Sequence, residues 1–213
     1  MLNSKKRDRR SFIKGSTALV AGMSLVSVGD LHAGTQYQQN DTFLVGPREG
    51  YTPRIGTLLS TMTMMRAMVM SQVQGLTVEQ LDFLVDEQAN SIGAMLLHLA
   101  ATERYYQLNT FEGLSWGTWS SEIKQEWDVP MELGAPARQK IKGHTLDHYL
   151  SVLEEVRSQT MAEFAKRDDQ WLEQQEPFFG GNPTNNHAKW FHVCEHESNH
   201  NGQIKFIKKR FSA

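Results

Sequence analysis

Apolar residues recur at intervals of three and four over several long segments of this chain, which is the period of an amphipathic helix. The pattern predicts helices from residue 53 to about 75, from 90 or 91 to about 108, from 145 to about 166 and from 187 to about 209. No segment alternates as a strand does, so we expect an all-α four-helix bundle. Residues 109–143, rich in Gly, Pro and Trp, are expected to form a long irregular connection between the second and third helices.

The N-terminus has the layout of a secretory signal peptide. A basic segment is followed by an apolar run from Gly15 to Val28, too short for an ordinary transmembrane span, and then by a small-residue cleavage site at Ala33. Arg9 and Arg10 resemble a twin-arginine signal, which exports folded proteins; an ordinary secretory signal is the alternative. We therefore expect a cleaved signal over 1–33, an extended leader over 34–50, the bundle over 51–213 and a periplasmic or otherwise exported location.

Charge and cysteine content narrow the partners. Residues 1–33 hold six Lys/Arg and two Asp/Glu, so the remaining chain has 16 basic against 22 acidic residues. Nucleic acid is not an expected partner, because phosphate binding calls for a basic patch. The single cysteine, Cys194, excludes an internal disulfide and is expected to be a small buried hydrophobe.

Three histidines four residues apart, His192, His196 and His200, stand in the last predicted helix. A step of four places each imidazole about 40° round the helix and about 6 Å further along, so the three form one stripe. Two neighbours in such a stripe can share a divalent metal; the alternative is a polar stripe on a surface helix. A third ligand must come from elsewhere, and His98, inside an apolar stretch of the second helix, is the candidate unless it is an ordinary core histidine.

The chain resembles the DinB/YfiT-like superfamily over roughly residues 52–210. The resemblance is carried by the segments 89–99, 144–150 and 192–204, the last with its histidine pair shortly before Gly202 and Gln203. It implies a four-helix bundle that binds a divalent metal, zinc or nickel, through His98, His196 and His200. The residues expected to support the ligands or line the pocket are His192, Glu103, Glu197, Asn199 and Gln203. For Glu103 and Glu197 a solvated position on the helix face is the alternative, and Glu197 is expected to flank the metal or face solvent. The family more often has a histidine where this chain has Asn199.

Three histidines leave a coordination position open, as in catalytic metal sites, where a bound water or thiol becomes a nucleophile. The resemblance implies thiol-dependent transferases or isomerases and some hydrolases, so we expect an exported metal-dependent enzyme. The alternative is a non-catalytic periplasmic metal-binding or structural protein. The expected partners of this protein are a small-molecule substrate such as a low-molecular-weight thiol, the twin-arginine export machinery and, as an option, a second copy in a homodimer.

Several other residues invite a functional reading. His196-Glu197-Ser198-Asn199-His200 also matches the His-Glu-x-x-His signature of zinc proteases, but only 13 residues follow it and none is a ligand type. If Thr145 caps the third helix, His144 lies outside it and cannot share a face with His148, which leaves both with surface or capping roles. The three tryptophans of the long connection either wall a pocket or pack as a satellite cluster: Trp116, Trp119 and Trp127.

Overall fold

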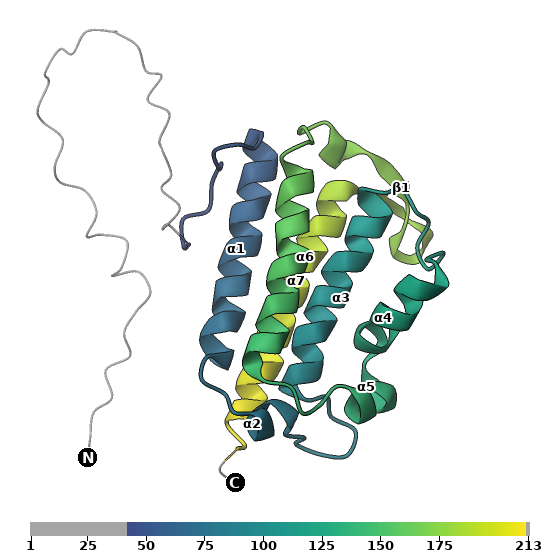
Figure 1. The fold of residues 1–213 in the computed structure, drawn as a ribbon. Helices are drawn as coiled ribbons and strands as arrows, with labels where there is room; N and C mark the ends of the chain where they lie inside the picture. Colours follow the sequence, from purple (N-terminus) through teal and green to yellow (C-terminus); the bar gives the residue numbers. More distant parts are fainter. Residues whose placement is uncertain (1–41, 212–213) are drawn as a thin grey trace, which may run out of the picture. The chain divides into compact units, whose positions relative to one another are not determined.

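Four long helices form the core of the computed structural model, which describes residues 42–211 (Figure 1). They are α1 (Pro53–Val73), α3 (Ile92–Thr110), α6 (Leu146–Phe164) and α7 (Asn186–Lys208). α1 packs on α7 and α6, and α3 packs on α6 and α7. The expected all-α four-helix bundle is confirmed. The expected signal peptide, with Arg9 and Arg10, lies outside the described residues.

Helix starts have both local and distant causes. The Ser91 hydroxyl accepts a hydrogen bond from Ala94 N at 3.2 Å, and the Asn185 amide oxygen accepts one from Ala188 N at 2.8 Å, so α3 and α7 begin at N-caps in their own sequence. The start of α1 is different. Its first free N–H groups, those of Arg54 and Ile55, donate to Asp169 Oδ1 at 3.1 and 3.3 Å. A carboxylate more than a hundred residues later in the chain therefore caps the first helix.

The connection between α3 and α6 is long, as expected, but it is largely helical rather than irregular. It contains α4 (Ser121–Glu132), which packs on α3, and α5 (Gly134–Lys140). The Ser120 hydroxyl accepts a hydrogen bond from Ile123 N at 3.4 Å and begins α4. Leu133 has φ 58°, a conformation that L-residues rarely adopt, and this turns the chain between α4 and α5. Pro130 lies inside α4 near its end and Gly134 begins α5, so these residues do not prevent the connection from being helical.

A small hairpin joins α6 to α7 after the 3₁₀ turn η3 (Trp171–Glu173). Strands β1 (Gln175–Pro177) and β2 (Pro183–Asn185) pair antiparallel, and the turn η4 (Phe179–Gly181) forms the tip (Figure 1). Lys189 of α7 forms an ion pair with Glu176 of β1 and donates to Asn109 Oδ1 of α3 at 2.9 Å. This buried lysine ties the hairpin to both helices.

The described part of the leader runs along α1. Gly46 N donates to Ser60 Oγ at 3.0 Å, and a Cβ on Gly56 would lie 2.5 Å from Arg48 N, so only glycine allows this approach. α2 (Val78–Asp82) follows α1 and begins with a capping box between Thr77 and Gln80.

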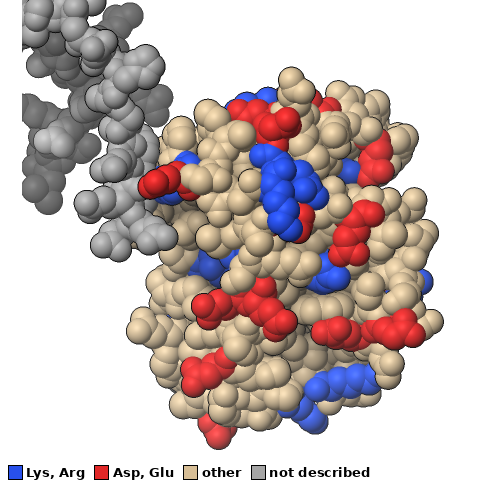
Figure 2. Space-filling model, turned by 45° about the horizontal axis from the view of Figure 1, so that its top comes forward, with Lys and Arg blue, Asp and Glu red and all other residues tan. Residues whose placement is uncertain are grey.

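None of the helices of residues 42–211 is both long enough and apolar enough to cross a membrane. On the face in Figure 2, basic and acidic side chains are interspersed, and that face carries no continuous basic area.

A candidate metal centre between α3 and α7

The packing of α3 on α7 brings three histidines together. His98 of α3 and His196 and His200 of α7 each offer a ring nitrogen, and these nitrogens all lie within 4.8 Å of one another. His98 Nε2 and His196 Nε2 are 2.7 Å apart. His98 and His200 are buried and His196 is half-buried. The geometry favours His196 and His200, rather than His192 and His196, as the two residues of α7 that could bind a metal together with His98.

Two of the three imidazoles have their other ring nitrogen engaged. His98 Nδ1 lies 3.0 Å from the carbonyl oxygen of Pro130, and His200 Nδ1 lies 3.1 Å from Gln203 Oε1. Because both partners are acceptors, Nδ1 carries the proton in each ring and Nε2 keeps its lone pair. Metal-ligating histidines are held in this way in proteins. The outer contacts therefore direct two lone pairs toward the centre of the cluster.

Burial keeps these imidazoles neutral. It lowers the pKa of His196 to about 3, with a further contribution from the neighbouring His200, His98 and His192. It also lowers the pKa of His200 to about 4, assisted by His98 and opposed by the hydrogen bond to Gln203. The pKa of His98 is lowered by burial against the opposing contacts with the backbone at Pro130 and Met131. At neutral pH all three are uncharged, which is the form that binds metal.

The donor set fits a divalent transition metal. Neutral imidazole suits zinc, nickel, copper and iron, and three such ligands leave positions for solvent or substrate. The three histidines could therefore hold a metal ion, and their chemistry does not select among these metals.

The carbonyl that holds His98 is free because of the break between α4 and α5. A continuing helix would use Pro130 O to accept from Gly134 N. Gly134 N donates instead to Asn90 Oδ1 at 3.0 Å, after the left-handed turn at Leu133. Pro130 O is thus left for His98 Nδ1. The long connection contributes to the site through its backbone, a role that the sequence did not suggest.

The other residues expected near the ligands divide into two groups, and His192, Asn199 and Gln203 belong to the first. The His192 ring stands one turn before His196, with its Nδ1 3.0 Å from the Tyr106 hydroxyl, and lines a cleft. Gln203 bonds His200, and its Nε2 donates to the exposed Asn199 at 3.4 Å. These three residues lie beside the cluster.

Glu103 and Glu197, in contrast, point into the bundle. Both are buried, and both accept hydrogen bonds from Arg66 and Arg157 at 2.7 to 3.0 Å. Burial by itself would raise the pKa of Glu103, but the charges of Arg157 and Arg66 outweigh it and lower the pKa. Neither a solvated position nor a contact with a histidine is found for these carboxylates among residues 42–211. The expectation that Glu197 flanks the metal or faces solvent is wrong, because the two arginines hold it inside the bundle.

This charged layer takes one residue from each long helix: Arg66 from α1, Glu103 from α3, Arg157 from α6 and Glu197 from α7. Apolar clusters lie on both sides of it along the bundle. Sequence reasoning missed the two arginines. A signal existed, since Arg66 lies between Met62 and Val69 on the apolar stripe of α1, where a solvated arginine would not be expected.

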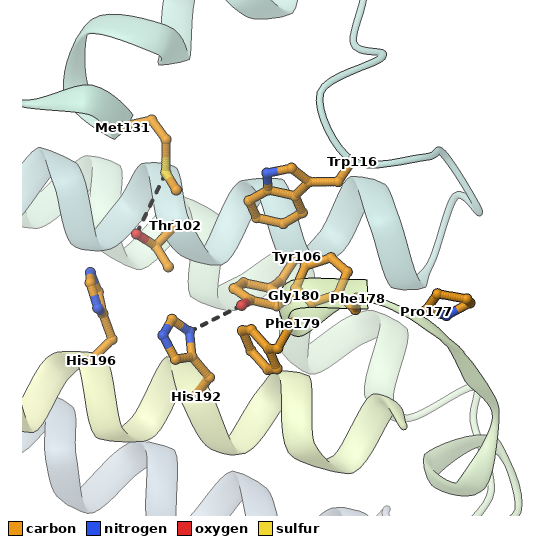
Figure 3. Close-up of a pocket in the computed structure, with 10 residues that line it drawn as sticks. All are labelled: Thr102, Tyr106, Trp116, Met131, Pro177, Phe178, Phe179, Gly180, His192 and His196. Atoms are coloured by element: carbon orange, nitrogen blue, oxygen red, sulfur yellow. Dashed lines mark hydrogen bonds between the residues drawn. The ribbon is translucent and has the colours of Figure 1, made fainter. Parts of the chain in front are cut away.

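A cleft of about 430 Å³ adjoins the histidine cluster (Figure 3). His196 and His192 of α7 form one side and Thr102 and Tyr106 of α3 another. The hairpin and the long connection supply the remaining lining residues: Trp116, Met131, Pro177, Phe178, Phe179 and Gly180. The cluster therefore does not lie in a sealed interior, because one of its histidines is part of the wall of an open cleft.

The cysteine, the three tryptophans and the pair His144 and His148 lie outside the histidine cluster. Cys194 is buried and hydrophobic in its surroundings, as expected. Trp116 lines the cleft, whereas Trp119 is buried in a satellite cluster with Tyr105 and Leu108 and Trp127 packs against that cluster. The expectation that His144 and His148 cannot face each other is wrong. Their exposed rings stack with centroids 4.1 Å apart, because His144, one residue before the N-cap Thr145, still reaches the first turn of α6.

Both the fold and the sequence of this chain resemble those of known proteins. The crystal structure of a conserved protein from Enterococcus faecalis matches with a TM-score of 0.54 and 11% identity, over 71% of this chain and 93% of that one, which shows the shared fold. The sequence profile of the mycothiol-S-transferase family matches residues 57–212. The chain belongs to the mycothiol-S-transferase family. No curated protein matches the sequence.

Membership of the mycothiol-S-transferase family confirms the DinB-like resemblance drawn from the sequence. The matched range includes the three histidines of the cluster and the four residues of the charged layer. The match begins after the N-terminal segment and carries no information on a signal peptide.

Proposed function

We propose that this protein is a metal-dependent S-transferase that joins a low-molecular-weight thiol to an electrophilic co-substrate. The observation that carries the proposal is the convergence of three neutral imidazoles at the wall of an open cleft, in a chain of the mycothiol-S-transferase family. His98, His196 and His200 would hold the metal. A divalent metal at this position would lower the pKa of a thiol bound to it.

The overall reaction forms one bond and breaks another. The thiolate sulfur donates an electron pair to an electrophilic carbon, the carbon–sulfur bond forms, and the leaving group departs with the pair from its own bond to that carbon. The proton of the thiol passes to solvent. The part played by the chain is to fix the imidazoles through Pro130 O and Gln203 Oε1 and to place the co-substrate in the cleft beside them.

The experiment compares metal content and thiol conjugation in four variants. His98→Ala, His196→Ala and His200→Ala should each lose bound metal, measured by mass spectrometry of protein purified without a chelating tag, and should lose conjugation activity. His144→Ala is the matched control, because that exposed histidine lies outside the cluster. Full metal content in His98→Ala would show that α3 does not contribute a ligand.

Two alternatives make different demands on the structure. A purely structural metal site would not need a cleft, and the open cleft beside His196 supports an enzyme instead. A zinc protease would need Glu197 as a base at the metal-bound water, yet its carboxylate binds Arg66 and Arg157. Glu197→Gln should therefore keep the metal and most of the activity. A loss of about a hundredfold with the metal retained would favour hydrolysis, since a general base contributes about 10² to 10⁴ in rate.

We further propose that the protein is exported through the twin-arginine route, on the sequence of residues 1–33 alone. Replacing Arg9 and Arg10 by lysine should leave the precursor in the cytoplasm. Mature protein outside the inner membrane in normal amounts would contradict the proposal.

A further inference from the structure

The cleft beside the histidine cluster has an unusual composition for a site that works with polar thiols. Its lining, as far as the described residues show, contains no Lys, Arg, Asp or Glu. Lys189 approaches the ring of Phe178, with its nitrogen 4.8 Å from the ring centroid, but its charge is met by Glu176. Cellular low-molecular-weight thiols carry several hydroxyl, amide or charged groups, and burying such groups without partners is unfavourable. The cleft is poorly suited to the polar part of the thiol.

Aromatic rings make up most of its walls. Trp116 meets Phe178 edge to face with centroids 5.1 Å apart and meets Tyr106 at 5.1 Å, while Phe179 lies 5.3 Å from His192 (Figure 3). The rings come from α3, the long connection, the hairpin tip and α7. A volume of about 430 Å³ lies within the usual range of about 300–1,000 Å³ for small-molecule sites. Aromatic walls of this kind favour a flat apolar molecule, which can stack on or meet their edges.

One ring nitrogen offers a polar contact in this aromatic part of the cleft. The side chain of Tyr106 is buried, so its hydroxyl needs a hydrogen-bond acceptor within the protein. His192 Nδ1, at 3.0 Å, is the hydrogen-bond partner that the structure gives this hydroxyl, and the hydroxyl therefore donates to it. The proton of His192 is then on Nε2. Figure 3 shows this second nitrogen turned away from Tyr106, on the side of His196.

We propose that this cleft binds the electrophilic co-substrate, and that the co-substrate is a flat, uncharged, apolar molecule whose single hydrogen-bond acceptor receives the N–H of His192. The inference rests on the proposed transferase function and adds the chemical class of its second substrate. His192 is on this account a specificity-determining residue that touches the co-substrate, and Tyr106 is a positioning residue that fixes the tautomer of His192.

The first test measures binding of an uncharged fluorescent aromatic, N-phenyl-1-naphthylamine, to the purified protein. The matched probe is 8-anilino-1-naphthalenesulfonate, which has the same rings and one negative charge. We expect one uncharged probe to bind per chain. The affinity for the sulfonate should be at least about tenfold lower, since no cation lines the cleft. Equal affinity for the two probes would overturn the proposal.

Variants locate the binding. Trp116→Ala and Phe179→Ala should each lower the affinity for the uncharged probe by about tenfold, as expected for truncation of an aromatic contact. Phe206→Ala should leave affinity unchanged, because this aromatic is 51% exposed on α7 and is not part of the cleft lining. Unchanged affinity in both cleft variants would show that the probe binds elsewhere and would overturn the proposal.

The second test addresses His192 by displacement of the probe with two naphthalenes of similar shape. 1-Acetylnaphthalene carries one carbonyl acceptor, and 1-isopropylnaphthalene carries none. We compare the ratio of the affinity for 1-acetylnaphthalene to the affinity for 1-isopropylnaphthalene. In the unaltered protein this ratio should be roughly two- to tenfold higher than in His192→Phe, which is the contribution of one ordinary hydrogen bond. Tyr106→Phe should reduce the ratio while keeping the walls intact. An unchanged ratio in His192→Phe would overturn the assignment of the N–H.

These measurements need neither metal nor thiol, so their outcome is independent of the proposed function. Binding of the uncharged probe without any thiol conjugation would contradict the transferase and leave the cleft's preference standing. Conjugation without selective binding would support the transferase and contradict this inference.

Discussion

At the scale of single residues, the outer contacts of the histidines matter as much as their spacing. His98 and His200 donate from Nδ1 to Pro130 O and Gln203 Oε1, and these bonds decide which nitrogen can bind a metal. The ligand assignment stays a prediction, and it makes demands on residues that would not themselves be ligands.

Gln203 gives the first prediction. Gln203→Met keeps the length of the side chain but removes the acceptor of His200 Nδ1–H, so metal affinity should fall by about 10- to 100-fold, the usual effect of removing such a partner. Competition with a chromophoric chelator measures the affinity. Asn199→Ala is the control, because Asn199 is exposed and reaches His200 only through Gln203. Equal affinities in the two variants would contradict the role of Gln203.

The second prediction concerns pH. Only neutral imidazole binds metal, and burial lowers the pKa of His196 to about 3 and of His200 to about 4. Proton competition should therefore leave metal affinity nearly constant from neutral pH to about 5.5, where an imidazole of ordinary pKa, about 6.5, is already mostly protonated. Chelator competition at a series of pH values tests this. A loss of affinity that begins near pH 6.5 would contradict it.

The same pKa values predict the pH dependence of the metal-free protein's stability. Between about pH 4 and 6.5 these histidines are neutral in the folded protein and protonated in the unfolded chain. The unfolded state binds more protons, so the free energy of unfolding should fall as the pH is lowered through this window, and these groups contribute no slope above it. Urea unfolding curves at several pH values measure the trend.

At the scale of elements, the break between α4 and α5 connects the long connection to the histidine cluster. Leu133 adopts φ 58°, and Asn90 Oδ1 accepts from Gly134 N at 3.0 Å. As a result Pro130 O does not continue the helix and is available to His98. A segment that reads as an irregular connector thus orients a candidate ligand.

Asn90 gives the third prediction. Asn90→Ala removes the acceptor of Gly134 N, which can then compete with His98 for Pro130 O, so stability should fall by about 1 kcal/mol and metal affinity should fall with it. Asn90→Asp is the control, because its carboxylate oxygen can still accept from Gly134 N. Thermal unfolding and chelator competition measure the two effects. A stability loss without any change in metal affinity would show that the break does not position His98.

At the scale of the whole molecule, the charged layer joins all four long helices. Arg66, Glu103, Arg157 and Glu197 balance in charge and lie between two apolar clusters. Because α7 carries both Glu197 and two histidines of the cluster, the layer also holds the rotation of α7 that turns the histidines toward α3.

Arg157 gives the fourth prediction. Arg157→Met leaves two buried carboxylates with Arg66 as their shared cation, and removal of one partner from a buried pair costs about 3–5 kcal/mol. Urea unfolding measures this change. Lys166→Ala is the control, since its ion pair with Glu163 is on the surface, with the lysine side chain 61% exposed, and should contribute no more than about 1 kcal/mol. Similar losses in the two variants would show that the layer is not a structural centre.

The sequence by itself determined the four long helices and the histidine stripe, because both depend on contacts between residues a few positions apart. Apolar periodicity and the N-caps Ser91 and Asn185 are local, and a spacing of four places His196 and His200 on one face wherever the helix lies. The capping of α1, in contrast, does not depend on nearby residues, since Asp169 supplies it from a distant loop.

Tertiary structure decided which faces meet. His98 lies next to His196 across 98 residues of sequence, and Glu197, one residue from a candidate ligand, is directed to Arg66 and Arg157 instead of solvent. Neither outcome is encoded in a short window, because the rotation of each helix is set by burying the apolar stripes and pairing the buried charges of all four helices together.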